Sequence, residues 1–191
     1  MNYYFFAASL PMLSLDSAPP LSYKTFKTQC SEHLSPRDAA ALSQLEPVIP
    51  ESSRHSFVSA WRENEIEIRN AVAKTRSERG AGNAADFLRK QRGYEPSIHR
   101  AVAEAFTADN PKDREKALDK IRWSLLDDME SRDQFSSCAV LGYSLKLRMS
   151  ERWNALSRED GRRSAGDIAE KPPSEENNAH EDAGLERRTN E

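Results

Sequence analysis

Metal ligation is the first chemistry to consider, because the sequence holds four histidines and two cysteines. The closest pair is Cys30 and His33, whose spacing of three residues would place both side chains on one turn of a helix. A zinc site needs at least three protein ligands, and no other histidine or cysteine lies near this pair in the sequence. We therefore expect packing or surface roles for both residues, with no bound metal or cofactor.

Acid–base catalysis would need a carboxylate whose pKa is shifted by a pocket. The adjacent pairs Asp127-Asp128 and Glu175-Glu176 have no such setting in the sequence, and neighbouring carboxylates usually form a solvated surface. The sequence also lacks the phosphate-binding loop, the G-x-S-x-G nucleophile elbow and the H-E-x-x-H metal motif. A non-catalytic protein is therefore predicted. An enzyme with an unrecognised site, which could use His99, is the weaker alternative.

A basic stretch between residues 74 and 92 is a candidate for binding phosphate groups. It contains Lys74, Arg76, Arg79, Arg89, Lys90 and Arg92, with Glu78 and Asp86 opposing them. With Phe87 and Tyr94 close by, these cations could bind the backbone of a single-stranded nucleic acid. The net charge of the chain is −3, however, and no recognised nucleic-acid module surrounds the stretch. A solvated connection between helices is favoured, so no nucleic-acid partner is expected.

The elements that would position these side chains are predicted to be helices, because no segment shows the regular alternation of a β-strand. The expected helices lie within residues 21–36, from Ser35 to Leu45, at 53–79 and at 84–91, from Pro96, from Pro111, and at 135–156. Ser35-Pro36 is a typical helix start, since serine caps the first turn and proline suits its first position. The predicted fold class is mainly α, a compact helical bundle.

The last predicted helix has the clearest periodicity. A near-heptad seam is formed by Phe135, Cys138, Gly142, Leu145, Met149, Trp153 and Leu156. Such a seam is typical of a helix packed against neighbouring helices, and Gly142 would allow a partner backbone to approach closely. The residues expected to anchor a single core are Phe57, Trp61, Trp123, Leu145, Leu147 and Trp153.

Composition divides the 191-residue chain into residues 1–158, expected to form one helical domain, and residues 159–191. The second segment is rich in charged and polar residues, with Ile168 and Leu185 as its only large aliphatic side chains. It is predicted to be a disordered tail, or else a short helix that orders on a partner. Two distant cysteines cannot form a disulfide framework, which favours a reducing cytoplasmic compartment.

An apolar run at residues 3–15 opens the chain, with aromatic side chains at four consecutive positions. It is too short to span a bilayer, which needs about 20 apolar residues, so no direct membrane insertion is expected. A signal peptide would usually carry lysine or arginine before the run, and none is present, although secretion stays open as an alternative. We predict a buried N-terminal segment, extended or fully enclosed.

Four stretches resemble an uncharacterised bacterial family whose members are encoded in V/A-type ATPase operons. The run from Tyr3 to Pro11, YYFFAASLP, is similar to the YYYLVASLP start of that family. The other three are Asn110-Pro111 leading to Ile121-Arg122-Trp123, the run from Tyr143 to Leu147, and Glu151-Arg152-Trp153 with Gly161 downstream. The family is in turn distantly similar to the C/d component of V-type ATPases, an all-helical socket that joins the central stalk to the membrane rotor ring.

The resemblance implies a non-catalytic subunit or accessory protein that binds stalk or rotor subunits through helical surfaces. It implies a cytoplasmic location, peripheral at the inner membrane through the ATPase complex. A transient assembly factor or regulator of the same complex is the alternative. The candidate docking segment contains Tyr3, Tyr4, Phe5, Phe6, Leu10 and Pro11, although the sequence does not separate a docking role for it from a core role.

Overall fold

The computed structural model describes residues 3–46, 52–80, 82–131 and 135–170, with residues 160–170 described by their backbone alone. These residues form seven α-helices and a short 3-10 turn, with no β-strand among them, which confirms the mainly helical fold class. The elements are α1 (Tyr4–Ser9), α2 (Tyr23–His33), α3 (Pro36–Gln44), α4 (Ser56–Glu78), η1 (Ala84–Asp86), α5 (Pro96–Ala105), α6 (Pro111–Ser131) and α7 (Ser137–Glu170).

Local sequence signals explain where several helices begin. The Ser22 hydroxyl accepts a hydrogen bond from the Thr25 amide at the start of α2. Ser35 accepts from the Asp38 amide at the start of α3, with Pro36 as the first helical residue. These side chains satisfy backbone donors that have no partner inside the helix. The predicted start at Ser35-Pro36 is therefore confirmed, whereas the helix expected at 84–91 is only the three-residue turn η1.

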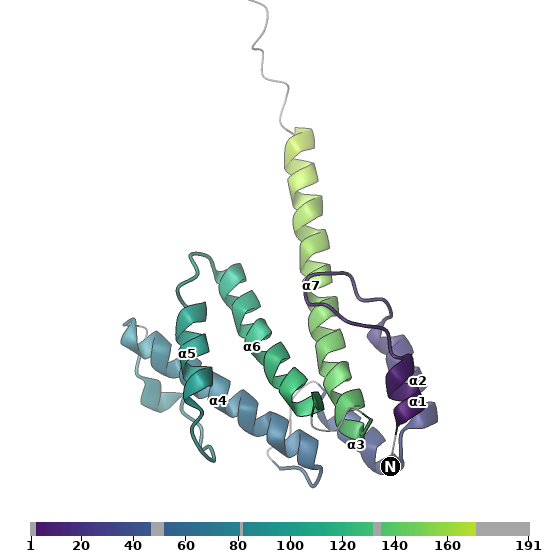
Figure 1. Cartoon of the computed structure of the whole chain (residues 1–191). Helices are drawn as coiled ribbons and strands as arrows, with labels where there is room; N and C mark the ends of the chain where they lie inside the picture. The colour runs from purple at the N-terminus through teal and green to yellow at the C-terminus, as the bar shows by residue number, and fades with distance from the viewer. Residues whose placement is uncertain (1–2, 47–51, 81, 132–134, 171–191) are drawn as a thin grey trace, which may run out of the picture. The chain divides into compact units, whose positions relative to one another are not determined.

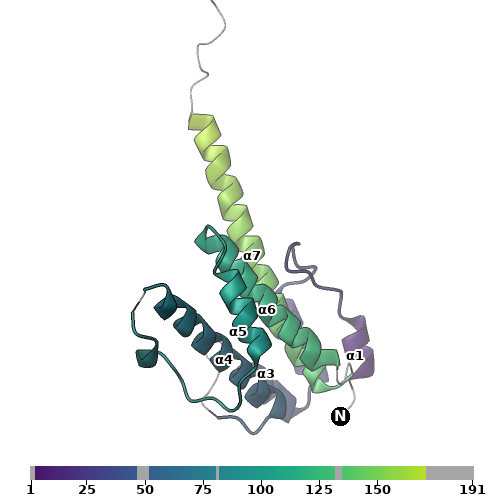
Figure 2. The same ribbon diagram turned by 60° about the vertical axis from the view of Figure 1, so that its left-hand side comes forward.

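Two hydrophobic cores formed by the described residues share α4. The first core surrounds Phe26 and Leu147 and includes Trp61 from the first half of α4. The second core joins α4, α5 and α6, and it includes Ile68 from the second half of α4. Helix α5 packs against both α4 and α6, as Figures 1 and 2 show. One long helix therefore belongs to both apolar clusters.

The six predicted anchors all belong to the first core. Phe57, Trp61, Leu147 and Trp153 are buried in it, and Trp123 and Leu145 are partly buried against it. The three tryptophans thus contact the same core.

The heptad seam predicted for α7 is only part of the face that is buried. Its central residues Cys138, Leu145, Met149 and Trp153 belong to the first core or pack against it. Phe135 and Leu156, at its two ends, are 38% and 40% exposed, whereas Val140 and Leu141, outside the seam, are fully enclosed. Alternating steps of three and four residues fit a supercoiled pair of helices, but a straight helix with 3.6 residues per turn drifts away from that repeat.

Gly142 approaches a side chain rather than a partner backbone, contrary to the prediction. A Cβ atom added at this position would lie 2.3 Å from Oε1 of Glu130. The glycine therefore makes room for a carboxylate of α6, which forms an ion pair with the Lys146 ammonium group at 2.7 Å.

The backbone of α7 continues to Glu170, past the predicted domain boundary at residue 158. The chain separates into two units by its internal contacts, Met1–Asn154 and Ala155–Glu191. The predicted disordered tail lies outside the described residues from residue 171 onward.

Candidate functional site

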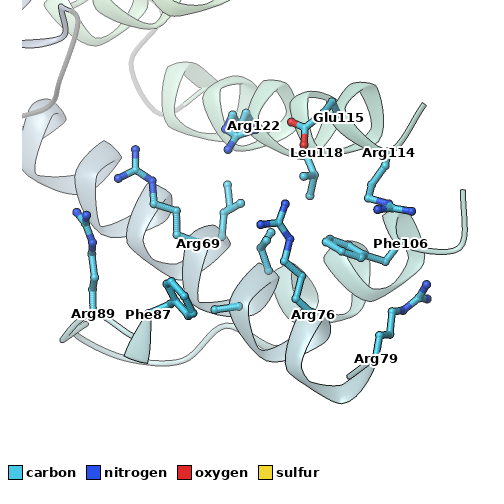
Figure 3. A pocket seen from close by; sticks show the side chains of 13 residues that line it. Arg69, Arg76, Arg79, Phe87, Arg89, Phe106, Arg114, Glu115, Leu118 and Arg122 are labelled. Atoms are coloured by element: carbon cyan, nitrogen blue, oxygen red, sulfur yellow. The ribbon is translucent and has the colours of Figure 1, made fainter. Parts of the chain in front are cut away.

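A pocket of about 720 Å³ is lined mainly by arginine side chains and is called the arginine-lined pocket below (Figure 3). Its walls come from α4, from the segment after η1, from the end of α5 and from α6. The residues that line it are Ile68, Arg69, Val72, Ala73, Arg76, Arg79, Phe87, Arg89, Phe106, Arg114, Glu115, Leu118 and Arg122. Six of these side chains are arginines and one is a glutamate, so the pocket is strongly cationic.

One face of α4 supplies half of these arginines. Arg69, Arg76 and Arg79 follow one another at intervals of seven and three residues, which places them along the same side of the helix. Val72 lies on that side between the first two and contributes apolar lining. In Figure 3 the Arg76 side chain extends into the space between α4 and α6.

The segment after η1 is held against α4 by a buried amide. Asn70, which is 4% exposed, accepts a hydrogen bond from the Arg89 amide and donates one to the Arg89 carbonyl, both at 2.8 Å. This reciprocal pair places the exposed side chains of Phe87 and Arg89 at the pocket wall. A segment without regular structure is thus fixed to a helix through its own backbone groups.

Phe106 lies between two of the arginines. The guanidinium carbon of Arg114 lies 4.9 Å from the centroid of the Phe106 ring, and that of Arg79 lies 5.7 Å from it. Both distances permit cation–π attraction, which orients the two cations around one aromatic ring.

Only part of this positive charge is neutralised by the protein. Arg122 forms ion pairs with Glu65 at 2.7 Å and Asp119 at 3.0 Å, and Arg69 lies 3.8 Å from Glu65. Burial alone would lower the pKa of Arg122, but the two carboxylates outweigh it and raise the pKa. In the part of the chain that is described, no ion pair involves the other four arginines of the pocket, which are Arg76, Arg79, Arg89 and Arg114.

The candidate docking segment at the N-terminus combines core and surface residues. Tyr3 and Phe6 are buried, whereas Tyr4 is 48% exposed and Phe5 is 87% exposed. Leu10 is half-buried and Pro11 is exposed. The segment is thus buried in part, and it is helical rather than extended, because residues 4–9 form helix α1 and a helix turns successive side chains to different sides.

The docking segment is attached to the rest of the unit at several points. The Tyr3 amide donates to the Phe135 carbonyl at 2.6 Å, and the Phe6 ring stacks on His33 with centroids 4.6 Å apart. The Tyr143 hydroxyl donates to the Pro11 carbonyl at 3.0 Å. The exposed side chains of α1 are therefore presented by an ordered support.

An aromatic patch, defined here as Tyr4, Phe5 and Phe135, covers the outer side of this support. The Tyr4 ring lies 5.4 Å from the Phe5 ring and 4.5 Å from the Phe135 ring, measured between centroids. Beyond it, the exposed Met12 and other residues of the run line a cavity of about 480 Å³ that also contacts Trp123. Clustered exposed aromatic side chains are a common mark of protein-binding surfaces.

Asp38 anchors the buried side of the docking segment. Its carboxylate accepts hydrogen bonds from the Tyr3 hydroxyl at 2.5 Å, the Ser35 hydroxyl at 2.7 Å and the His55 ring at 3.1 Å. Burial alone would raise the pKa of Asp38, but the three hydrogen bonds outweigh it and hold the pKa below the ordinary value of 3.8.

We expect the stabilisation from Asp38 to be lost in acid. A depressed pKa in the folded state means that this contribution is complete above pH 3.8 and disappears as the pH falls toward the lower folded value. The Asp38→Asn variant should therefore melt below the wild type at neutral pH, with a difference that narrows below about pH 4. Melting curves across this range, followed by circular dichroism, check it. A difference in melting temperature that stays constant with pH would contradict this account.

The residues considered for metal or acid–base chemistry are separated in the structure. Cys30 is 1% exposed, and burial raises the pKa of its thiol to about 12. His33 packs against Phe6 instead of sharing a site with Cys30. His99 packs against Tyr94 in a tilted arrangement, with ring centroids 4.5 Å apart, and does not line the arginine-lined pocket. Among the described residues, no group of three metal-ligating side chains converges.

The basic stretch is likewise divided. Arg76, Arg79 and Arg89 line the pocket, whereas the Lys74 ammonium group lies over the Tyr94 ring, 5.7 Å from its centroid. The pocket could not be predicted from the basic stretch alone, because Arg114 and Arg122 come from α6, which begins well after Arg92, the last residue of the stretch. The signal that could have indicated it is the shared face of the α4 arginines.

Comparison with known proteins gives a partial match. None of the described helices is both long enough and apolar enough to cross a membrane. No curated protein and no solved structure matches the chain. Residues 97–171, which include all of α6 and α7 and all but the first residue of α5, match the family described as "Protein of unknown function (DUF2764)".

Proposed function

We propose that this chain is a non-catalytic subunit or accessory protein of a bacterial V/A-type ATPase, and that it binds a stalk or rotor subunit through the aromatic patch. The observation that carries the proposal is the exposure of Phe5, 87%, on a helix whose opposite side is fixed in the core. Moving a phenylalanine side chain out of water is favourable by about 1.5–3 kcal/mol. A partner that covers Phe5 would gain this free energy, which the isolated chain does not.

The support beneath the patch favours a docking role. A flexible segment would have to be ordered on binding, which costs about 0.5–1.5 kcal/mol for each immobilised side chain. Here Tyr3 and Phe6 already fix α1, and Tyr4 contacts Phe135 in the turn before α7. A partner surface would therefore meet preordered aromatic side chains, which commonly supply a large share of binding energy.

The setting in a V/A-type ATPase rests on the resemblance of the four sequence stretches. Three of them lie within residues 97–171, the segment that matches the family of unknown function. The fourth, Tyr3 to Pro11, lies outside that segment and is the one that carries the exposed aromatic side chains. In this proposal the protein is held at the cytoplasmic side of the inner membrane by the complex.

The experiment is a pull-down from detergent-solubilised membranes of the native host at low salt, with the tagged full chain as bait. We expect stalk or rotor subunits to be recovered with the wild type and to fall at least tenfold with Phe5→Asp, which corresponds to about 1.4 kcal/mol or more. Phe87→Asp is the matched control, because Phe87 is also exposed, 67%, but lies at the arginine-lined pocket.

The outcomes separate the alternatives. Recovery of the bait alone, or equal recovery with both variants, would contradict docking through the patch. The ratio of the chain to the other subunits in the purified ATPase then distinguishes a permanent subunit from a transient assembly factor, since an assembly factor is present below stoichiometric amounts.

A further inference from the structure

The arginine-lined pocket carries more positive charge than the protein neutralises. Four of its six arginines have no ion-pair partner in the described part of the chain, and the two that are paired share Glu65. Glu115 is the single carboxylate among the described lining residues. Cations gathered without counter-charge repel one another, so a bound anion would lower the free energy of this arrangement.

Two of the unpaired arginines, Arg79 and Arg114, are held close to the Phe106 ring. Both lie within cation–π distance of it, at 5.7 Å and 4.9 Å from its centroid. The Nε atom of Arg114 is buried and has no hydrogen-bond partner among the described residues. A buried donor without a partner costs about 1–3 kcal/mol, and an anion in the pocket could supply the acceptor.

Arginine also restricts the kind of anion. The guanidinium group is a planar fork of donors that matches carboxylate and phosphate oxygens in pairs. A single phosphate occupies one or two such forks, whereas this pocket offers four unpaired arginines, within the described residues, on three separate elements: α4, the segment after η1 and α6. Linked phosphate groups would satisfy more of them than a single one.

The size and the apolar lining fit a small ligand. A volume of about 720 Å³ lies within the usual range for small-molecule sites, roughly 300–1,000 Å³. Ile68, Val72 and Leu118 supply apolar lining, and the Phe87 ring is 67% exposed at the wall. An exposed aromatic ring beside a cationic pocket can stack on a planar heterocycle while the arginines bind its phosphates.

We propose that this pocket binds a ligand with a di- or triphosphate group. The shared chemistry is the chain of phosphates, and its source is either a nucleotide or inorganic polyphosphate. The inference goes beyond the proposed function and uses a different surface, so each can fail without the other.

The test is calorimetric titration of the full chain with ATP and with inorganic tripolyphosphate, at low and at raised salt. We expect binding that weakens with salt, and a fall in affinity of about tenfold to a hundredfold in the double variant Arg76→Ala/Arg89→Ala. Both side chains are at least partly exposed, so this variant should fold, which its melting temperature verifies. The control Arg37→Ala/Arg100→Ala removes the same charge from exposed positions that do not line the pocket.

A conservative variant separates specific recognition from general charge. Arg76→Lys keeps the positive charge but loses the paired donors, so we expect it to bind less tightly than the wild type. Tighter binding of ATP than of tripolyphosphate, with the difference removed by Phe87→Ala, identifies a nucleotide as the source. Equal affinities would show that only the phosphate chain is recognised, which favours inorganic polyphosphate as the source.

Several results would overturn the proposal. They are the absence of binding by either probe, an equal loss of affinity in the control double variant, and tighter binding of a polyglutamate peptide or a single-stranded oligonucleotide. The last two probes represent a macromolecular partner for the same cationic surface.

Discussion

Replacing Asp119 with alanine is expected to lower the free energy of unfolding by about 3–5 kcal/mol. The side chain is 1% exposed and accepts hydrogen bonds from Arg122 at 3.0 Å, from the Trp153 indole at 2.7 Å, and from Arg152. Alanine would leave the Trp153 indole N–H without its acceptor and would break the ion pair with the largely buried Arg122, which keeps Glu65 as its other partner. Removing one partner of a buried ion pair is strongly destabilising. Urea unfolding followed by circular dichroism measures the loss.

Asp16 provides the control for this experiment. It also forms an ion pair, with Lys116 at 2.5 Å, but its side chain is 61% exposed. Ion pairs in water contribute little, so Asp16→Ala should leave the midpoint of urea unfolding almost unchanged. Asp119→Asn, which keeps an acceptor oxygen and removes the charge, should fall between the two. Equal losses for Asp119→Ala and Asp16→Ala would contradict a structural role for the buried network.

Phe26→Ala should also lower the free energy of unfolding by about 3–5 kcal/mol, because it leaves a cavity in the core. The Phe26 ring is fully enclosed and packs against the rings of Tyr143, Tyr23 and Phe6, at centroid distances of 5.2, 6.1 and 6.5 Å. Removing it leaves a cavity that three neighbouring aromatic side chains cannot fill. The midpoint of urea unfolding gives the loss, provided that the slope of the transition is unchanged.

The matched comparison is Phe5→Ala, the same substitution at the position next to the buried Phe6 but on the exposed side of α1. It should change the free energy of unfolding by less than about 0.5 kcal/mol. If the two variants lost equal stability, the assignment of Phe26 to the core and Phe5 to the surface would be wrong. The same two variants distinguish an effect on folding from an effect on docking. Only Phe5 belongs to the aromatic patch, so Phe5→Ala should weaken binding of the partner without lowering stability.

The helical fold could be predicted because its signals are local. A capping serine, a proline at the first helical position and an apolar stripe all act within a few residues, as at Ser35-Pro36. The buried face of α7 could not be predicted from local sequence signals of this kind. Its orientation depends on how α6 packs, and Glu130 occupies the space that Gly142 leaves.

The candidate sites show the same limit more strongly. Four consecutive aromatic residues indicate a functional or core segment. Which of them are buried depends on the turn of α1, which places Tyr3 and Phe6 in the core and leaves Tyr4 and Phe5 exposed. The arginine-lined pocket depends on Asn70, which fixes residue 89 against α4, and on α6, which is distant in sequence. Such long-range contacts leave no pattern in neighbouring residues.

The sharing of α4 between two cores has a consequence for cooperativity. Trp61 and Ile68 lie two turns apart on one continuous helix, with Glu65 between them bonded to Arg122 of α6. Neither cluster can melt without exposing its half of that helix and weakening the hydrogen bonds of the other half. The unit that ends at Asn154 should therefore unfold in a single cooperative transition. A destabilising substitution in either core should lower the stability of both cores.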